Sequence, residues 1–203
     1  LMNREVGQEI DFLDLMSVSD FEPVEYPSPY SETLNDDVVH PCALHDWGGY
    51  NYITAYTPYP YTNDDYENPC VAVSSDGIAQ ALPDEETPNP VFDNIYTDGF
   101  NSDPTIAVAA DGALILMWRY SIGATGDLPD YPANRQGFQW VKTYDGITFS
   151  DVTIISQFTS GEGYYLSPSL LWNGTQWELY AVDKNAAGYG VVRWLLDDLD
   201  GPL

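Results

Sequence analysis

From residue 40 onward, short apolar runs alternate with pairs of turn residues. The runs are rich in Val, Ile, Tyr, Trp and Thr, and the pairs between them are Asp76-Gly77, Asp98-Gly99, Asp111-Gly112, Asp145-Gly146 and Asn173-Gly174. Such pairs favour the tight turns of β-hairpins, with positive φ at both central residues. No segment beyond residue 39 keeps a helical apolar period for three turns, as the helices of an α/β protein would. The pattern predicts an all-β domain of antiparallel meanders over residues 40–203.

Residues 1–39 have a different pattern. Val6, Ile10 and Leu13 fall at helical spacing and predict one short amphipathic helix, after which the prolines between residues 23 and 29 impose extended backbone. The segment holds ten acidic residues against Arg4 alone. We interpret it as an extended acidic arm. The two alternatives are a flexible leader and a segment that docks on a partner or along the domain surface.

A polar residue followed by proline precedes an apolar strand four times. These pairs are His40-Pro41, Asn68-Pro69, Asp103-Pro104 and Ser167-Pro168, and their spacings are 28, 35 and 64 residues. Repeats near this length are typical of propeller blades, the longest with an inserted loop. Radial repetition would bring the start of each innermost strand to a shared axis, and proline is permitted at the first position of a strand. The pattern predicts a β-propeller with about four visible blades.

The residues around these pairs resemble those of a known family. The segments are His40-Pro41, Tyr56-Thr57-Pro58-Tyr59-Pro60, Tyr66-Glu67-Asn68-Pro69, Asn101-Ser102-Asp103-Pro104 and Leu166-Ser167-Pro168-Ser169. Over residues 38 to 200 they are similar to five-bladed β-propellers related to glycoside hydrolase family 43, in particular those of bacteriophage tail or virion proteins. The resemblance implies an axial pocket that binds a sugar. In hydrolytic members, three carboxylates at successive blade openings act as base, as modulator of the pKa of the acid, and as general acid.

At those three positions the chain has His40, Asn68 with Glu67 before it, and Asp103. Only Asp103 matches as a carboxylate, so the resemblance implies sugar binding without catalysis. A sugar site needs stacking rings and convergent polar groups, although core packing is the alternative for each aromatic residue. The predicted ligand-binding residues are His40, Trp47, Tyr56, Glu67, Asn68, Asp103, Arg119, Ser167 and Tyr180. If the protein is an enzyme, the catalytic candidates are Asp103, Glu67 and Glu162.

Metal and cofactor signals are weak. The segment Asn63-Asp64-Asp65-Tyr66-Glu67 clusters oxygen ligands of the kind that Ca²⁺ takes, but it lacks the spacing and the glycine of an EF-hand loop. His40 and His45 have no third ligand at a spacing typical of zinc. Cys42 and Cys70 are expected to be small buried residues. We expect no metal and no cofactor, with Ca²⁺ as the open alternative.

The charge balance excludes several classes of function. The 203 residues carry 32 acidic and 6 basic side chains, a formal net charge of -26. Six cations cannot form the basic stripe that nucleic-acid binding requires, and an anionic membrane surface would repel the protein. The hydrophobic fraction of 44% supplies a core. No apolar run reaches the roughly 18 residues that span a bilayer, and no secretory signal is visible. We expect a soluble protein that tolerates its self-repulsion best at high salt.

Three hypotheses follow from the sequence. The first is a non-enzymatic glycan-binding or architectural propeller of a phage virion or tail, which contacts host cell-surface carbohydrate and docks on other virion proteins through residues 1–39. Such a protein would be located on the virion, or otherwise outside the cell, within an oligomeric assembly. The second is an active glycoside hydrolase, and the third is a purely structural virion subunit. Because fewer blades are visible than five, we expect a fragment rather than a ring closed by the arm or a partner chain.

Overall fold

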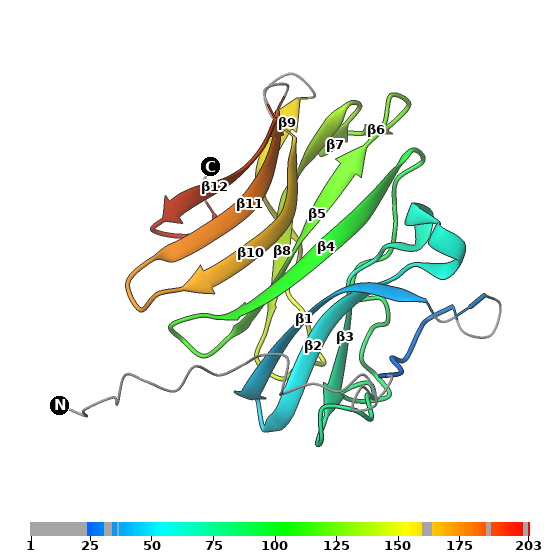
Figure 1. Cartoon of the computed structure of the whole chain (residues 1–203), viewed down its shortest axis with the longest axis vertical. Coiled ribbons are helices and arrows are strands. Elements are labelled where there is room, and N and C mark those ends of the chain that lie inside the picture. The colour runs from blue at the N-terminus through cyan, green and yellow to red at the C-terminus, as the bar shows by residue number, and fades with distance from the viewer. Residues whose placement is uncertain (1–23, 31–33, 36, 160–163, 186–187, 201–202) are drawn as a thin grey trace, which may run out of the picture.

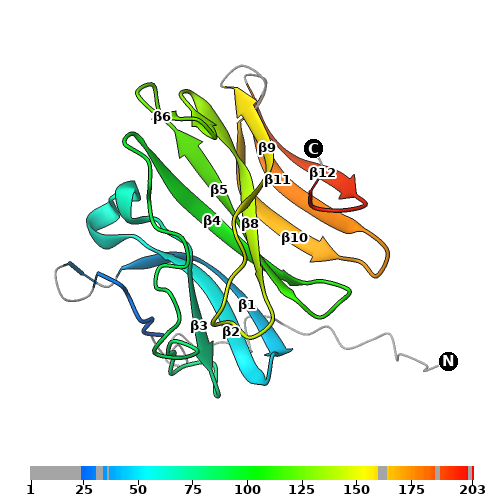
Figure 2. The same cartoon turned by 180° about the vertical axis from the view of Figure 1, so that it is seen from behind.

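The chain forms antiparallel β-sheets that follow one another in sequence (Figures 1 and 2). The computed structural model describes residues 24–30, 34–35, 37–159, 164–185, 188–200 and 203. The predicted N-terminal helix and Glu162 lie outside these residues. The only helices in the described part are two 3₁₀ turns, η3 (Pro60–Thr62) and η4 (Asp64–Tyr66), and no helix there is long and apolar enough to cross a membrane. The all-β prediction is confirmed.

Three main sheets make up the described part of the chain. The first has the order β1 (Val38–Trp47), β2 (Tyr50–Pro58) and β3 (Cys70–Ser74). The second has the order β4 (Gly99–Val108), β5 (Leu114–Ile122), β8 (Arg135–Thr143) and β9 (Thr153–Thr159). The third has the order β10 (Tyr165–Trp172), β11 (Trp177–Asn185) and β12 (Gly188–Leu196). A small hairpin of β6 (Asp127–Leu128) and β7 (Tyr131–Pro132) lies between β5 and β8 in the chain.

The first strands of the three sheets meet at the centre of the molecule. Strand β4 contacts both β1 and β10, and the sheets fan outward from these strands (Figure 1). The prediction of about four visible blades is wrong, because the pair Asn68-Pro69 precedes β3, the third strand of the first sheet, and opens no sheet of its own. A proline that donates no ladder hydrogen bond is tolerated at the start of any strand, not only an innermost one.

The other three X-Pro pairs occupy equivalent places in β1, β4 and β10. Each is preceded by one or more residues of its strand, and the pairing with the next strand shifts at this point. His40, Asp103 and Ser167 have φ of 55°, 53° and 50°, the left-handed region that residues with a side chain seldom enter. The three sheets therefore share one local distortion, and it recurs every 63 or 64 residues of the chain.

Two apolar layers hold the three sheets together, and β5 contributes to both. Leu114, Leu116 and Trp118 belong to the cluster shared with the first sheet, whereas Ile115 and Met117 belong to the cluster shared with the third. All five side chains are buried, because alternate residues of a strand point to opposite faces of the sheet. A strand covered on both faces has a continuous apolar run in its sequence, which here extends from Leu114 to Trp118.

The Asp-Gly and Asn-Gly turns differ from the predicted form. Gly112 and Gly174 have positive φ, whereas the preceding Asp111 and Asn173 are absent from the positive-φ residues of the described chain. The side-chain oxygens of these residues instead accept backbone N–H groups, as in the bond from Ala113 N to Asp111 Oδ1 of 3.1 Å. Gly99 makes no turn and begins β4. The positions of four of the five turns were therefore predicted, but not their geometry.

The described part of the predicted arm lies against the first sheet. The rings of Tyr26 and Tyr56 have centroids 4.7 Å apart, and the Tyr56 hydroxyl donates to the carbonyl of Pro27. The rings of Tyr30 and Tyr66 are 4.9 Å apart. These contacts cover β2 and the loop before β3.

Candidate functional site

The three distorted X-Pro pairs surround a common space at the centre of the molecule. His40-Pro41, Asp103-Pro104 and Ser167-Pro168 line a cavity of about 210 Å³. A larger cavity of about 400 Å³ shares His40, Asp103 and Ser167 with it, and we call this larger cavity the axial pocket. The axial pocket is lined by Val39, His40, Tyr59, Asp64, Glu67, Phe100, Ser102, Asp103, Arg119, Leu166 and Ser167.

Asp103 is the most connected side chain of the axial pocket. Its Oδ1 lies 3.2 Å from Nε2 of His40, and its Oδ2 accepts hydrogen bonds of 3.0 Å from Nε of Arg119 and from the backbone N–H of Ser167. The carboxylate is buried, so it depends on these partners for its stability. It links one residue from each of the three sheets and fixes the orientation of His40 and Arg119.

Glu67 lies on the other side of the His40 ring. Its Oε1 is 3.8 Å from Nδ1 of His40, a nitrogen that also lies 3.3 Å from Oγ1 of Thr57. Burial raises the pKa of Glu67 from 4.5 to about 7, and the neighbouring Asp103 carboxylate adds to the rise. A carboxyl group with this pKa can accept or donate a proton at neutral pH. The His40 side chain is 40% exposed and lies between the two carboxylates.

Arg119 carries an unused hydrogen-bond donor. Its guanidinium lies over the rings of Phe100 and Tyr164, with Cζ 5.3 Å and 5.9 Å from the ring centroids. Its Nε binds Asp103, but its Nη1 is buried and has no hydrogen-bond partner in the described chain. Buried donors are nearly always paired in native proteins, so this nitrogen indicates a missing acceptor.

A buried polar network supports the pocket from behind. Oδ1 of Asn101 accepts from Nε1 of Trp118 at 2.9 Å and from Nε2 of Gln139 at 3.2 Å, while Nδ2 of Asn101 donates to Oδ1 of Asn68 at 2.9 Å. Asn68 in turn donates to the hydroxyl of Tyr30. Because Asn68 and Asn101 are close in sequence to Glu67 and Asp103, this network fixes the backbone that carries the two carboxylates.

The structure brings only some of the predicted ligand-binding residues together. His40, Glu67, Asp103, Arg119 and Ser167 line the axial pocket. The other predicted residues that the structure describes lie elsewhere: Asn68 in the buried network, and Trp47, Tyr56 and Tyr180 on the strands.

Each of the three aromatic side chains away from the pocket has a local partner. Nε1 of Trp47 donates to the carbonyl of Gly112 at 2.9 Å between the first and second sheets. Tyr56 is fully buried. The hydroxyl of Tyr180 donates to Glu178 Oε2 at 2.7 Å on β11. Trp47 and Tyr56 are therefore core residues, which was the alternative to ligand binding for each aromatic residue.

Several residues of the axial pocket were not predicted. Phe100 and Ser102 belong to the strand that carries Asp103, so the Asp103-Pro104 motif could have indicated them. Tyr59 and Asp64 come from the irregular connection between β2 and β3, where no periodic pattern indicates which side chains face the centre. Tyr164 does not line the pocket, but its ring contacts the Arg119 guanidinium from the segment just before β10.

The acidic segment proposed as a Ca²⁺ alternative forms a turn. Oδ1 of Asn63 accepts the backbone N–H of Asp65 at 3.1 Å and caps η4, while Asp64 lines the axial pocket. Within the residues that the structure describes, no three or more His, Cys, Asp and Glu side chains are grouped so as to hold a metal ion. The expectations about metal and cofactors stay predictions.

Comparison with known proteins relates the chain to carbohydrate-active proteins. No family model matches it. It is 36% identical over 136 residues to the A type blood N-acetyl-α-D-galactosamine deacetylase of Flavonifractor plautii. This match covers 64% of this chain and 18% of the relative. The crystal structure of an N-acetylgalactosamine deacetylase from F. plautii, in complex with blood group B trisaccharide, superposes with a TM-score of 0.73 at 21% identity. That match covers 88% of this chain and 55% of the solved one.

Glycoside hydrolases of family 43 have a similar fold. A thermostable member gives a TM-score of 0.60 at 12% identity over 87% of this chain and 57% of the solved one. A Bacillus subtilis arabinanase gives 0.57 at 13% identity over 84% and 55%. These matches show that the fold is a five-bladed β-propeller fold related to family 43 enzymes and to the deacetylase, of which the described residues form three sheets. The chain spans 18% of the curated relative's length and 55% of the solved deacetylase.

Proposed function

We propose that this chain belongs to a carbohydrate-active protein that hydrolyses the acetamido group of an N-acetylated sugar bound in the axial pocket. The observation that carries the proposal is the pairing of Glu67 and Asp103 with the two nitrogens of His40 in one pocket, where Glu67 has a pKa of about 7. Titratable groups perturbed in this way gather at catalytic sites. The 36% identity to an N-acetyl-α-D-galactosamine deacetylase supports the choice of reaction.

The residues of the pocket supply the groups that amide hydrolysis needs. The Glu67 carboxylate accepts a proton from a water molecule as the water oxygen bonds to the carbonyl carbon of the acetamido group. The C–N bond then breaks, the nitrogen takes up a proton, and acetate and an amine leave. His40 lies between the carboxylates and is the most exposed of the three side chains, so it is placed to donate a proton to the departing nitrogen.

Arg119 is the residue that would stabilise the carbonyl group of the proposed substrate. Its unpaired Nη1 is buried at the pocket, where a donor can stabilise the negative charge that develops on the carbonyl oxygen during attack. Asp103 and the two flanking rings hold the guanidinium in place before the substrate binds.

The test is an assay that records two products together. We expect the purified chain to release acetate from a blood group A trisaccharide, which carries N-acetylgalactosamine, without releasing reducing ends. Glu67→Gln removes the base while keeping the shape of the side chain, and should lower the rate by about 10²–10⁴-fold. Glu85→Gln, which makes the same change at an exposed residue, is the matched control and should keep full activity.

The remaining outcomes separate the rival functions. Reducing ends without acetate would replace the proposal with a glycoside hydrolase. Binding without either product would favour the glycan-binding propeller, which the non-acidic His40 and Asn68 at two of the three catalytic positions support. Absence of both binding and products would favour a structural subunit. A virion or extracellular location, an oligomeric assembly and docking through residues 1–39 stay predictions.

A further inference from the structure

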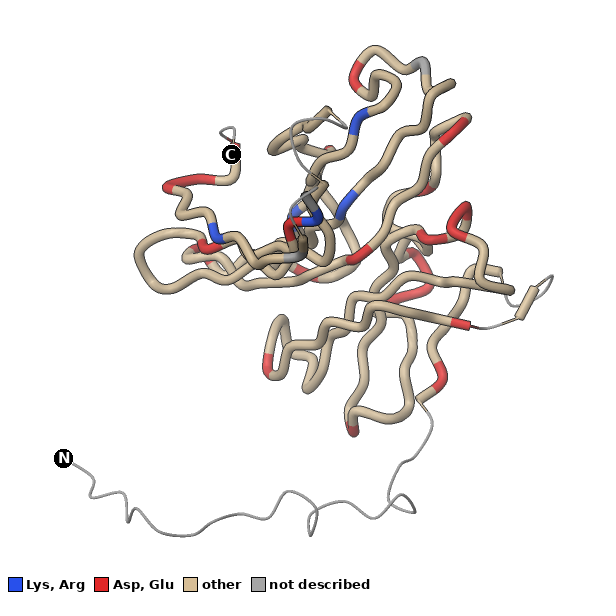
Figure 3. Tube along the Cα trace, turned by 45° about the horizontal axis from the view of Figure 1, so that its top comes forward, with Lys and Arg blue, Asp and Glu red and all other residues tan. Residues whose placement is uncertain are grey.

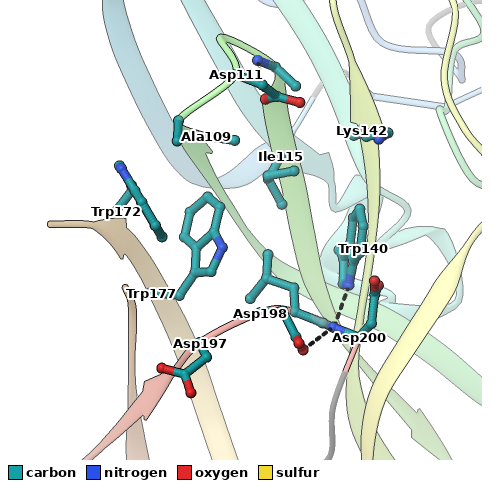
Figure 4. A pocket seen from close by; sticks show the side chains of 13 residues that line it. Ala109, Asp111, Ile115, Trp140, Lys142, Trp172, Trp177, Asp197, Asp198 and Asp200 are labelled. Atoms are coloured by element: carbon teal, nitrogen blue, oxygen red, sulfur yellow. Dashed lines mark hydrogen bonds between the residues drawn. The ribbon is translucent and has the colours of Figure 1, made fainter. Parts of the chain in front are cut away.

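A second cavity lies away from the axial pocket and shares no lining residue with it. It has a volume of about 270 Å³ and is formed where the β4–β5 and β10–β11 hairpins approach the end of β8 (Figure 4). The segment 197–200, which follows β12, closes it from below in this view. Its volume is slightly below the roughly 300 Å³ at which small-molecule sites usually begin, so it would hold a single sugar ring rather than an extended chain.

Indole rings form the walls of this cavity. Trp140 and Trp177 are buried and Trp172 is half-buried, and the rings of Trp172 and Trp177 meet edge to face with centroids 5.2 Å apart. Nε1 of Trp140 donates to the carbonyl of Leu199 at 3.0 Å, which fixes the segment after β12 against β8. Ile115 and Leu199 complete the apolar lining. The walls are therefore formed and held before any ligand binds.

Carboxylates surround the aromatic walls. Asp111, Asp197, Asp198 and Asp200 line the cavity, against the single cation of Lys142. The Asp111 carboxylate is oriented by the Tyr144 hydroxyl at 2.7 Å, and Asp198 Oδ1 accepts the backbone N–H of Asp200 at 3.1 Å. Nζ of Lys142 lies 5.9 Å from the centroid of the Tyr144 ring. Aromatic faces and an excess of carboxylates both favour a cationic ligand.

We propose that this cavity binds a protonated amino sugar, with its ring against the tryptophans and its ammonium group among the carboxylates. A neutral sugar of the same size would gain the aromatic contact but not the attraction of the carboxylates. The site goes beyond the proposed function and does not depend on it. If the axial pocket does remove acetyl groups, its product would carry the amine that this cavity selects.

Calorimetric titration of the purified chain with galactosamine, galactose and N-acetylgalactosamine tests the proposal. Galactosamine should bind, while the two neutral sugars should bind at least about tenfold more weakly at this cavity. Trp172→Ala should weaken galactosamine binding by about fivefold or more, because it removes a half-buried aromatic face of the cavity. Asp200→Asn should also weaken it, whereas Asp151→Asn, the same charge change at an exposed residue elsewhere, should not.

A further variant separates this cavity from the axial pocket. Galactosamine binding that persists in Glu67→Gln and weakens in both Trp172→Ala and Asp200→Asn supports the proposal. Binding that Glu67→Gln abolishes and both cavity variants retain would place the amino sugar in the axial pocket and overturn the proposal. Equal affinity for galactose and galactosamine would overturn the selection for a cation.

Discussion

Three residues at the centre of this molecule have a left-handed backbone conformation. His40, Asp103 and Ser167 each precede a proline, and a non-glycine residue pays roughly 1–2 kcal/mol for this conformation. Such distortions persist where the surrounding structure enforces them, and they gather at functional sites. Here the distortion recurs in three sheets, and in each first strand the distorted residue lines the axial pocket. The geometry of the site thus arises from the backbone repeat rather than from a single loop.

The raised pKa of Glu67 predicts how the reaction depends on pH. Because the proposed base must be ionised, and burial raises its pKa to about 7, the rate of acetate release should rise as the pH is raised from 5 toward about 7. Without burial, the rise would occur near pH 4.5. A pH–rate profile of kcat/KM on the purified chain checks this. A profile that is flat between pH 5 and 8 would contradict the role of Glu67 as base.

The same pKa makes Glu67 a cost to folding at neutral pH. A carboxyl whose pKa is raised in the folded state binds its proton more tightly there, so the contribution of Glu67 to stability is most favourable below pH 4.5 and is lost as pH rises through about 7. The rise to about 7 corresponds to about 3 kcal/mol at about 1.4 kcal/mol per pKa unit. Denaturant melts at pH 4.5 and 7.5 should therefore show Glu67→Gln gaining stability relative to wild type at the higher pH, while Glu85→Gln does not.

Sequence reasoning found the polar residues of the axial pocket better than its aromatic ones. His40, Asp103 and Ser167 were identified by the proline that follows each of them. Ring contacts such as that of Phe100 with Arg119 depend on how close neighbouring strands and sheets approach, which no spacing along the chain encodes. In a chain with 16 tyrosines, the aromatic residues of a site resemble those of the core.

Two turns of the fold use the same set of hydrogen bonds. Asp145 Oδ1 accepts the backbone N–H groups of Ile147 and Thr148 at 2.8 Å, and Thr143 Oγ1 donates to it at 3.0 Å. Asp76 after β3 makes the equivalent bonds with Ser74, Ile78 and Ala79. Each turn ends the third strand of its sheet, so these turns mark the same point in two repeats.

The turn at Asp145 should be measurably stabilising. The backbone N–H groups of Thr148 and Ile147 lower the pKa of Asp145, so its contribution is present above the usual pKa of 3.8 and is lost as pH falls through the lowered value. Asp145→Ala should lower Tm by about 2–4 °C at pH 7, and the difference should shrink below about pH 4. Thermal melts of Asp145→Ala and of the exposed control Asp151→Ala check this. Equal melting of the two variants at pH 7 would contradict it.

The error in the blade count shows what a local motif leaves out. The intervals of 28 and 35 residues around Asn68 add to 63, nearly the interval of 64 between Asp103 and Ser167, so the true period was present in the sequence. Asn68-Pro69 imitated a blade opening because proline is tolerated at the start of any strand. The absence of positive φ at Asn68 distinguishes it from the other three residues, but φ is a tertiary outcome that a dipeptide does not fix.

The whole molecule carries an extreme excess of negative charge. Figure 3 shows Asp and Glu spread over the turns and loops of the described chain, with few Lys and Arg among them. Arg119 forms an ion pair with Asp103, and Arg193 forms one with Glu178, so each of these two cations already neutralises one carboxylate. With 32 acidic and 6 basic side chains in the full sequence, the carboxylates far outnumber the cations that could neutralise them. Their mutual repulsion acts against the compact state.

Salt should therefore stabilise this protein. Raising NaCl from 0.1 to 1 M shortens the screening length from about 10 Å to about 3 Å, which weakens repulsion between surface carboxylates much more than it weakens the buried Arg119–Asp103 pair. Tm should rise by several degrees across this series. The variant Asp130→Asn/Asp151→Asn removes two exposed charges and should gain more stability at low salt than at high salt. A Tm that falls with NaCl, or a variant effect independent of salt, would show that specific ion pairs rather than net repulsion dominate the electrostatics of the fold.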